Sequence, residues 1–540
     1  MSPSADINSP WNKRSLRYLL ENTNEFVSIV ELVNSRGVIT EHGGSKVLHL
    51  ARNLADLPGI HALSITDNPG GNAVLSAGTL GFDLISRGQE VIIHLSCKDW
   101  NRNGLQSHAW QLASEGFDNI LALSGDYPAE GYHGQASGVF DIDSVGLLKM
   151  LSDMNAGLET LSPKGRKSQL KRTNFFLGTV VNNFKPYERE VMPQYFKLAK
   201  KVESGAAFVI NQIGYNSRKM DELLKYMSLK GMNLPALANI YVLSGPSARY
   251  FNSGRIPGVV VSDELLTVVE KYAGGKDKGK AFFHEFAAKQ FAVARGLGYR
   301  GAYLGGHLKF EDFQHILDLS NSFRDDDWKD FILEFGFDAP DEFYFFEPNI
   351  ETGLNSTEIN RDYVASKTPE GRRALRRQVP LTYKLNRTAH DLLFEENSAA
   401  FKAGRKLFAS AEDRNTVRKV VHSVEQAVKI PAFDCRDCGD CSLPDIAYLC
   451  PESQCVKNQR NGPCGGTREG KCEIGEKDCI WARAYDRLKA YDEEESMLNR
   501  PVIYRDGTLK GTSAWGNTYL GRDHHATARA AEQSENQNPS

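Results

Sequence analysis

Between residues 25 and 310, short apolar runs alternate with amphipathic stretches along the chain. Eight of these runs are rich in Val, Ile, Leu and Phe and show little alternation of apolar and polar positions. Such runs are typical of strands that are buried on both faces of a parallel sheet. The predicted strands are residues 26–31, 62–66, 90–97, 119–124, 174–181, 207–213, 235–243 and 301–305.

The amphipathic stretches between the strands predict helices, among them residues 193–203 and 220–229. Pro193 suits the first position of a helix, where its missing N–H is not needed. Both stretches end beside a glycine, which is a helix-stop signal. Eight strand–helix units fit a (β/α)8 barrel, which typically takes ~250 residues. A doubly wound open sheet would alternate too, but the count of eight and the lack of a Gly-rich dinucleotide fingerprint favour the barrel.

The chain has 540 residues, which is too many for one compact core. We expect an N-terminal extension (1–24), a barrel (25–320), a charged helical linker region (321–429), a cysteine-rich domain (430–495) and a largely disordered tail (496–540). The predicted fold class is therefore α/β, a (β/α)8 TIM barrel followed by a helical segment and a small cysteine-rich metal-binding domain.

Charge and composition exclude some classes of protein. The formal net charge is -3, which gives no basis for binding nucleic acid or an anionic membrane. The N-terminal residues lack the apolar segment of a secretory signal, and no apolar run reaches the ~18 residues that span a bilayer. The sequence thus predicts a cytoplasmic protein whose partners include neither nucleic acid nor a membrane.

Catalytic residues of such barrels lie at the carboxyl ends of the strands and on the loops that follow. A polar residue at a strand end is more often a helix cap or a loop anchor. Glu31 is less ordinary, because a carboxylate that ends an apolar strand is seldom buried without a partner or a function. Glu31 and Asp126 end different strands, so one pocket could give them different acidities for acid–base chemistry.

Four stretches resemble the methylenetetrahydrofolate reductase family and occur in the order found in that family. They are ALSITDNPGG at 62–71, VIIHLSCKDWNR at 91–102, GFDNILALSGDYP at 116–128 and KKVESGAAFVINQ at 200–212. The resemblance covers about residues 25–310 and implies a (β/α)8 barrel with a flavin cofactor. It also implies an oxidoreductase of one-carbon metabolism that interconverts 5,10-methylenetetrahydrofolate and 5-methyltetrahydrofolate.

The resemblance implies roles for individual residues. Glu31 matches the general acid that protonates N10 of the folate as its five-membered ring opens. Asp126 matches an aspartate that faces the pterin and the flavin, and Gln212 matches a glutamine that hydrogen-bonds the pterin. The positions that contact the flavin are matched by Thr66, His94, Asp126 and Lys201. In such an enzyme the cofactor carries the hydride, while the protein supplies the proton and the orientation.

The chain departs from the family pattern at three places. The first strand keeps Glu31 but lacks the prolines that commonly follow it. Ser124 replaces an arginine that often precedes the Gly-Asp pair, which removes a cation from the flavin phosphates and leaves both FAD and FMN as candidates. Lys185 stands before Pro186 where the family has a histidine, and we interpret it as a replacement cation or, more simply, a solvated lysine.

Eight of the nine cysteines fall between residues 435 and 479, and Cys97 stands alone. In a long chain without a signal segment, this density indicates metal ligation rather than disulfides. The C-x2-C-x2-C pattern and a later Cys-Pro pair favour an iron–sulfur cluster, two four-cysteine zinc sites are the alternative, and unligated thiols are the third interpretation. The predicted ligands are Cys435, Cys438, Cys441, Cys450, Cys455, Cys464, Cys472 and Cys479.

Residues 430–490 are similar to a C-terminal domain found beside some bacterial methylenetetrahydrofolate reductases. The similarity rests on NGPCGG at 461–466, KCE at 471–473 and CIWARAY at 479–485. In anaerobes a similar domain can occur as a separate subunit. The resemblance therefore implies that a protein donor, rather than NAD(P)H, could deliver electrons to the flavin.

Three hypotheses follow from these patterns. The preferred one is a flavin-dependent oxidoreductase that acts on a tetrahydrofolate derivative, with electrons from NAD(P)H or from a protein donor. The second is a folate-binding methyltransferase or demethylase barrel whose cysteine module docks a partner protein, and the third is a non-catalytic scaffold. The presence of both Glu31 and Asp126 argues against the scaffold. The direction of the reaction and homo-oligomer formation stay open.

Overall fold

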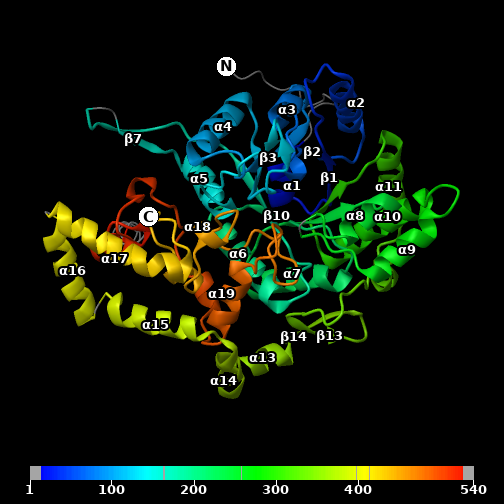
Figure 1. The fold of residues 1–540 in the computed structure, drawn as a ribbon. Coiled ribbons are helices and arrows are strands. Elements are labelled where there is room, and N and C mark those ends of the chain that lie inside the picture. The colour runs from blue at the N-terminus through cyan, green and yellow to red at the C-terminus, as the bar shows by residue number, and fades with distance from the viewer. Residues whose placement is uncertain (1–13, 162–163, 257, 397, 413, 527–540) are drawn as a thin grey trace.

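The computed structural model describes residues 14–161, 164–256, 258–396, 398–412 and 414–526. Eight parallel strands close into a barrel in the order β1-β12-β11-β10-β9-β4-β3-β2 (Figure 1). Each strand overlaps one of the predicted runs, and the predicted (β/α)8 fold is confirmed. The strands are β1 (Val27–Leu32), β2 (Ala62–Ile65), β3 (Glu90–Ser96), β4 (Asn119–Leu123), β9 (Phe176–Val181), β10 (Phe208–Asn211), β11 (Ala236–Tyr241) and β12 (Gly301–Gly305).

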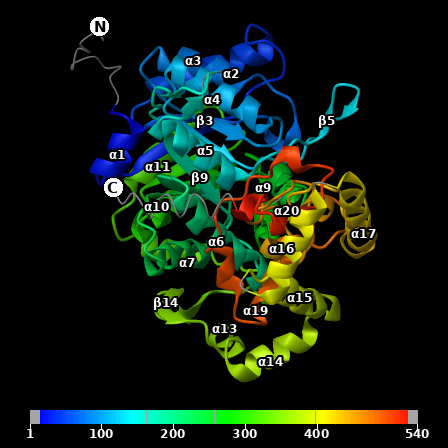
Figure 2. The same cartoon turned by 90° about the vertical axis from the view of Figure 1, so that its left-hand side faces the viewer.

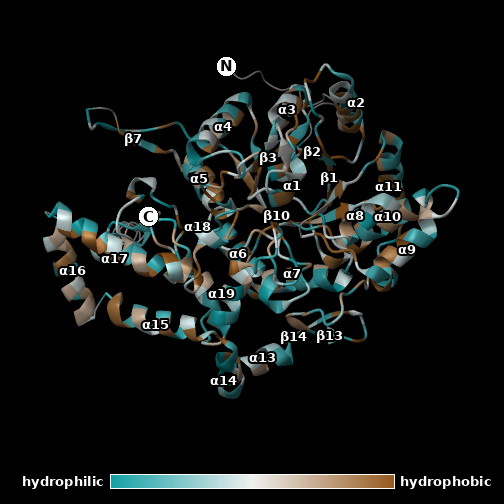
Figure 3. Cartoon of the chain, in the orientation of Figure 1, coloured by the Kyte–Doolittle hydropathy of each residue, from teal (hydrophilic) through white to brown (hydrophobic). Residues whose placement is uncertain are grey.

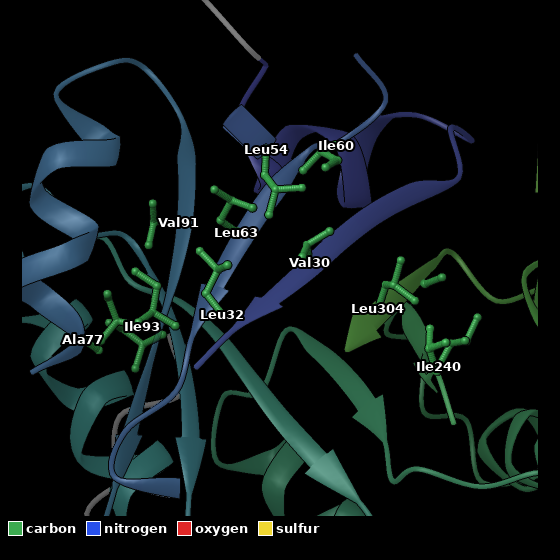
Figure 4. Packing of buried hydrophobic residues seen from close by; sticks show 14 of the residues in the cluster. Val30, Leu32, Leu54, Ile60, Leu63, Ala77, Val91, Ile93, Ile240 and Leu304 are labelled. Atoms are coloured by element: carbon green, nitrogen blue, oxygen red, sulfur yellow. The ribbon is translucent and has the colours of Figure 1, made fainter. Parts of the chain in front are cut away.

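Helices follow the strands and cover the barrel, with apolar side chains such as Leu54, Leu63 and Ile93 packed between the two layers (Figure 4). Local capping fixes where several helices begin, since the carboxylate of Asp143 accepts from the N–H groups of Val145 and Gly146. The covering helices are α2 (His42–Asp56), α3 (Ala77–Ile85), α4 (Arg102–Glu115), α5 (Ser144–Ala156), α6 (Glu188–Glu203), α7 (Ser217–Leu229), α8 (Gly245–Asn252), α9 (Asp263–Ala273), α10 (Lys280–Leu297) and α11 (Phe310–Ser322).

Three short elements interrupt the barrel loops. The 3-10 turn η1 (Pro69–Gly71) follows β2. Two hairpins lie between β4 and β9, and the second projects away from the barrel (Figure 1). Their strands are β5 (Glu130–Gly131), β6 (Gly134–Gln135), β7 (Glu159–Leu161) and β8 (Lys167–Gln169).

Helix α6 begins five residues before Pro193, so the prediction that Pro193 occupies the first helical position is wrong. A proline at this place removes a backbone hydrogen bond of the helix. Residues 190–198 are all buried, and packing on every side holds the helix together despite that loss. The barrel lies on one side of α6 and the cysteine-rich module on the other.

The amino-terminal end of the barrel is closed by α1 (Leu16–Asn22). Its side chains Leu16, Leu19 and Leu20 are buried with inward residues of the strands, including Val27 and Ile29. Arg300 donates hydrogen bonds to the carbonyls of Leu19 and Leu20 and so holds the helix in place. Residues 14–24 thus include a structural part of the barrel, and residues 1–13 of the expected extension lie outside the described residues.

The segment expected to be a helical linker is mostly helical but also contains a two-stranded hairpin that packs against α7. The hairpin strands are β13 (Phe346–Asn349) and β14 (Leu354–Ile359). Helices α15–α17 project from the barrel (Figures 2 and 3). Apolar side chains on these helices, such as Leu407 and Val420, are exposed to solvent. The helical elements are α12 (Trp328–Phe331), η2 (Ile332–Glu334), α13 (Arg361–Ser366), α14 (Pro369–Gln378), α15 (Leu381–Leu393), α16 (Ala399–Glu412) and α17 (Asn415–Phe433).

The cysteine-rich module, here residues 434–526, shares an apolar core with the barrel. Trp481, Tyr485 and Leu488 of the module lie in one buried cluster with Met192 and Phe196 of α6. The segment has little apolar core of its own, and its packing on the barrel supplies the rest. Its helical elements are η3 (Pro444–Ile446), α18 (Pro451–Gln454), α19 (Ile480–Lys489), η4 (Glu494–Met497), η5 (Gly507–Leu509) and α20 (Ala514–Tyr519).

Residues 496–526 were expected to belong to a disordered tail, and this expectation is wrong. They form η5 and α20, and they bury Ile503, Asn517 and Asp523 against the module. Their polar composition hid this order, because buried hydrogen bonds rather than apolar contacts hold much of the segment. Residues 527–540 lie outside the described residues. Among the helices that are described, none is long and apolar enough to cross a membrane.

Candidate functional site

Glu31 ends the inward-facing row of β1, which also contains Val27 and Ile29. Its side chain stands at the carboxyl end of the barrel, where the hydroxyl of Tyr303 donates a hydrogen bond to Oε2 at 2.9 Å. Burial raises the pKa of Glu31, and the bond from Tyr303 opposes this only in part. Glu31 therefore holds its proton at a higher pH than an exposed glutamate, as a proton donor must.

A polar network inside the barrel supports Glu31 from below. The hydroxyl of Tyr303 lies 3.1 Å from Ser64 Oγ and 3.1 Å from His94 Nε2, and Ser64 Oγ lies 2.9 Å from the same His94 nitrogen. Burial lowers the pKa of His94 to about 3, so the imidazole is neutral near pH 7. The structure thus places His94 beneath Glu31, two hydrogen bonds from the mouth.

Two tyrosines of this site were not singled out from the sequence. Tyr303 lies in the middle of β12, and Tyr241 ends β11 directly beside Gly305. A Cβ at Gly305 would lie 3.5 Å from both Glu31 Oε1 and the Tyr241 ring, so these groups surround one small space. Burial and the nearby Glu31 raise the pKa of Tyr241 to about 12. Period-two counting along the predicted strands would have placed both tyrosines in the inward row.

Asp126 follows β4 and connects two loops at the mouth. Its Oδ2 accepts a hydrogen bond of 2.8 Å from the backbone N–H of Gly70. Next to it, Gly71 has a φ of 74° and so little space that a Cβ would lie 2.2 Å from the carbonyl oxygen of Tyr127. The glycine is thus required for the loops after β2 and β4 to meet. Asp126 lies at the predicted end of the barrel, where it joins the loops after β2 and β4.

Thr66 and Gln212 lie at the carboxyl ends of β2 and β10, as predicted. Thr66 donates to the carbonyl of Leu32 from both its N–H and its hydroxyl. Gln212 accepts from the N–H of Ile213 through Oε1, which leaves its amide nitrogen directed near Gly258. Both residues therefore lie at the mouth of the barrel.

Lys201 lies elsewhere. It is on α6, and its Nζ donates to the carbonyl of Val180 at 2.5 Å from behind β9. Burial and the neighbouring Lys197 lower the pKa of Lys201 to about 7. The structure therefore brings Glu31, Thr66, Asp126 and Gln212 to the mouth of the barrel, places His94 below it and Lys201 outside the ring of strands.

The cysteine-rich module lies against the β4 and β9 side of the mouth. Ser124 Oγ donates to Gln459 Oε1 at 3.1 Å, and Lys197 Nζ donates to the same oxygen at 2.9 Å. Asp143 accepts from the backbone and the side chain of Asn461. Ser124, which replaces the arginine of the family pattern, thus contacts the module. Sequence reasoning did not identify this contact, because nothing in a local pattern links residues over three hundred positions apart.

Lys185 is not the solvated lysine that was the simpler interpretation. Its side chain is 2% exposed and donates to the carbonyl of Thr467 in the module. Burial lowers the pKa of Lys185, whereas Glu190, Cys464 and Glu473 oppose that shift. The lysine therefore supplies a buried positive charge next to the cysteines of the module.

The first four cysteines, Cys435, Cys438, Cys441 and Cys450, line one small enclosed cavity. We call them the outer set, because they follow the projecting helix α17. The backbone N–H of Asp437 donates to Cys435 Sγ at 3.5 Å, and Lys429 Nζ lies 3.5 Å from Cys441 Sγ. A positive charge and N–H donors directed at sulfur are suited to metal-bound thiolates.

The last four cysteines, Cys455, Cys464, Cys472 and Cys479, form the inner set, which lies next to the barrel. Burial raises the pKa of Cys455 to about 12, and the neighbouring thiols Cys464 and Cys479 add to the rise. Gly466 N–H donates to Cys464 Sγ at 3.4 Å. Unligated thiols this crowded would stay protonated, and a bound cation would instead stabilise all four as thiolates.

The geometry defines a (β/α)8 barrel protein with a buried carboxyl group of raised pKa at its mouth and a module of two four-cysteine sets packed beside it. Residues 40–271 match the family model "Methylenetetrahydrofolate reductase", and residues 414–506 match the model "Methylene-tetrahydrofolate reductase C terminal". The chain is a methylenetetrahydrofolate reductase family barrel fused to the methylenetetrahydrofolate reductase C-terminal domain.

Solved structures similar to this chain include an uncharacterized protein from Clostridium thermocellum that binds two copies of 5-methyl-5,6,7,8-tetrahydrofolic acid. It is 12% identical, with a TM-score of 0.38, over 55% of this chain and 94% of that one. An oxaloacetate acetylhydrolase is 13% identical, with a TM-score of 0.30, over 55% of this chain and 81% of that one. No curated protein matches the chain significantly.

Proposed function

We propose that this chain is a flavin-dependent oxidoreductase that interconverts 5,10-methylenetetrahydrofolate and 5-methyltetrahydrofolate. The observation that carries the proposal is the Glu31–Tyr303 pair at the mouth of a barrel that belongs to the methylenetetrahydrofolate reductase family. A carboxyl group whose pKa is raised by burial can deliver a proton near neutral pH. That is the step that opens the five-membered ring of the folate.

Other residues at the mouth would orient Glu31 and bind the pterin. Tyr303 orients Glu31 through its hydrogen bond, and the neutral His94 and Ser64 hold the tyrosine from below. Gln212, at the carboxyl end of β10, is the proposed contact of the pterin, and its amide nitrogen lies near Gly258. Removal of water from this pocket would keep the Glu31 proton from exchanging with solvent.

A flavin would supply the hydride when bound. The residues present fit such a group, because the buried Asn182 Oδ1, directly after β9, lacks a hydrogen-bond partner among the described residues, and polar edges of a cofactor satisfy atoms of this kind. Thr66 and Asp126 are the proposed direct contacts. His94 would act through Tyr303 and Lys201 through Val180, so these two would position the site rather than touch the flavin. Both FAD and FMN are compatible with this set.

The cysteine sets support a protein electron donor over direct use of NAD(P)H. The C-x2-C-x2-C pattern of the outer set favours an iron–sulfur cluster there. The inner set lies beside Lys457, whose Nζ donates to the carbonyl of Gly125 at the mouth. Electrons that enter at the outer set could therefore reach the barrel.

Purification without oxygen, followed by an absorption spectrum and metal analysis, tests the proposal. We expect flavin absorbance near one equivalent per chain, iron with acid-labile sulfide, and reduction of the flavin by a low-potential protein donor. A chain that binds a folate but neither holds nor takes up a flavin would contradict the oxidoreductase and support the methyltransferase hypothesis. Zinc without iron would contradict the route for electrons and leave the barrel chemistry to NAD(P)H.

A further inference from the structure

We infer that the C-terminal module holds a third metal site, in which Asp445, His524 and His525 bind one divalent transition-metal ion. The site is separate from both cysteine sets and from the barrel mouth. One ligand atom from each of the three residues lies within 4.8 Å of the other two. Two imidazoles and one carboxylate are a common ligand set for Zn²⁺ and Fe²⁺ in proteins.

The three side chains converge on one point. Asp445 Oδ2 lies 3.0 Å from His524 Nε2 and 3.5 Å from His525 Nε2. Ligand atoms about 2.0–2.2 Å from one zinc ion would lie roughly 3.3 Å from one another, so the observed spacing needs little adjustment. Asp445 comes from η3, and the histidines come from a helical segment, residues 524–526, that follows α20, which places the ion between segments about eighty residues apart in sequence.

Neighbouring groups orient each ligand. His524 Nδ1 faces the buried carboxylate of Asp440 at 2.5 Å, which directs Nε2 toward the proposed ion. Arg500 lies 3.3 Å from the other oxygen of Asp445, Oδ1. Asp523 accepts from the N–H of Ala526 and from the hydroxyl of Thr518, so the helical segment that carries both histidines is itself fixed. Carboxylate–histidine pairs of this kind are the usual support of a bound metal.

A cavity of about 370 Å³ opens next to the three ligands. Its wall includes His390, Arg387 and Tyr448, and His390 and His525 also line a second cavity that extends to Cys441. A metal held by three protein ligands keeps open positions for water or a small anion, and the cavity gives those positions access to solvent. The cations Arg387 and Arg500 on its wall would favour an anionic ligand.

A simpler reading of the same contacts is a histidine cation. Protonated His524 could bridge Asp440 and Asp445 with no metal present, and this would also hold residues 524–526 against the module. The two readings differ in what they require of His525. The cation bridge needs only His524, whereas the metal site needs both imidazoles. His525 is also the more exposed of the two, at 32%, so its replacement is compatible with folding.

Zinc titration of the full chain distinguishes the readings, after the cysteine sets have been loaded and free metal removed. We expect the parent to bind one further Zn²⁺, with nitrogen and oxygen neighbours at about 2.0–2.1 Å in its X-ray absorption spectrum rather than sulfur at ~2.3 Å. His525→Ala should lower the affinity for that ion by ~100-fold or more, beyond the effect of losing an outer-shell partner. His315→Ala, which removes an exposed histidine on α11, is the matched control and should bind like the parent.

His525→Gln keeps a polar side chain of similar size and serves where the alanine variant is poorly folded. Loss of the nitrogen and oxygen signal in either variant, with flavin and iron content unchanged, supports the site and leaves the proposed reductase function untouched. Equal zinc binding by the parent and both His525 variants, or zinc coordinated by sulfur alone, would overturn the proposal and leave the His524 cation bridge as the explanation.

Discussion

Lys457 of the cysteine-rich module donates a hydrogen bond of 2.8 Å to the carbonyl oxygen of Gly125, at the end of β4. Gly125 directly precedes Asp126, and Lys457 also forms an ion pair with the buried Glu473. The same lysine therefore connects the inner cysteine set with the loop that carries a predicted catalytic residue. The module therefore forms part of the wall at the mouth of the barrel rather than an appended domain.

Replacement of Lys457 by methionine should destabilise the protein by about 3–5 kcal/mol, because Glu473 would remain as a buried charge without its partner. Both side chains are 4% exposed. Urea unfolding of the parent and the variant measures the change. The double variant Lys457→Met/Glu473→Gln should recover much of the loss, and Lys477→Met, at an exposed lysine of the same module, should change little. Equal effects at Lys457 and Lys477 would contradict the buried pair.

Tyr303→Phe should move the pH dependence of folate turnover. The hydroxyl of Tyr303 stabilises the Glu31 carboxylate, so its loss raises the pKa of Glu31 further. A hydrogen bond to a charged group contributes about 1.5–3 kcal/mol, which corresponds to about 1–2 pH units. Since the acid must be protonated to act, the alkaline limb of the kcat/KM profile should move to higher pH. An unmoved limb would mean that another group is the acid.

Glu31→Gln should lower folate turnover by ~10²–10⁴-fold, the usual contribution of a positioned proton donor. Reduction of the bound flavin by an artificial donor should stay close to that of the parent, because that reaction needs no proton at N10. Steady-state folate assays and anaerobic flavin titrations measure the two effects. Loss of both activities would show that the variant has lost the cofactor and would not support the assigned role.

The Glu31→Gln variant should also change how the free energy of unfolding depends on pH. Burial raises the folded-state pKa of Glu31 above its ordinary value of 4.5. The stability that protonated Glu31 contributes is present below pH ~4.3 and is lost as the pH rises through the folded-state pKa. Glutamine has no proton to lose. The free energy of unfolding of Glu31→Gln should therefore exceed that of the parent at neutral pH and approach it in acid.

Serine variants of the two cysteine sets should lose metal separately. Cys438→Ser is expected to remove the iron of the outer set, and Cys479→Ser that of the inner set, each with about half of the total iron. Hydrogen exchange should increase near residues 435–450 in the first variant, and near the contacts with α6 in the second. Cys97→Ala, at an isolated buried thiol, should keep the full metal content. Complete loss of metal in both variants would indicate one shared cluster.

The barrel could be predicted from the sequence because its strands are buried on both faces, and each strand therefore appears in the sequence as a short apolar run. The same reasoning placed Glu31, Thr66, Asp126 and Gln212 at strand ends. It could not place Lys201 behind β9 or His94 below Tyr303, because the direction of a side chain depends on register and on neighbours distant in sequence. Order in residues 496–526 was missed for a related reason, since buried carboxylates such as Asp440 fix that segment.

Helix α6 has a consequence for any attempt to separate the two halves of the chain. Met192 and Phe196 pack on Trp481, Tyr485 and Leu488 in one apolar cluster, so a barrel cut off before residue 430 would present that surface to water. Such a fragment should associate with itself or require the module in trans. The contact has the apolar character of an obligate interface, so the barrel and the module should not separate into independently stable fragments.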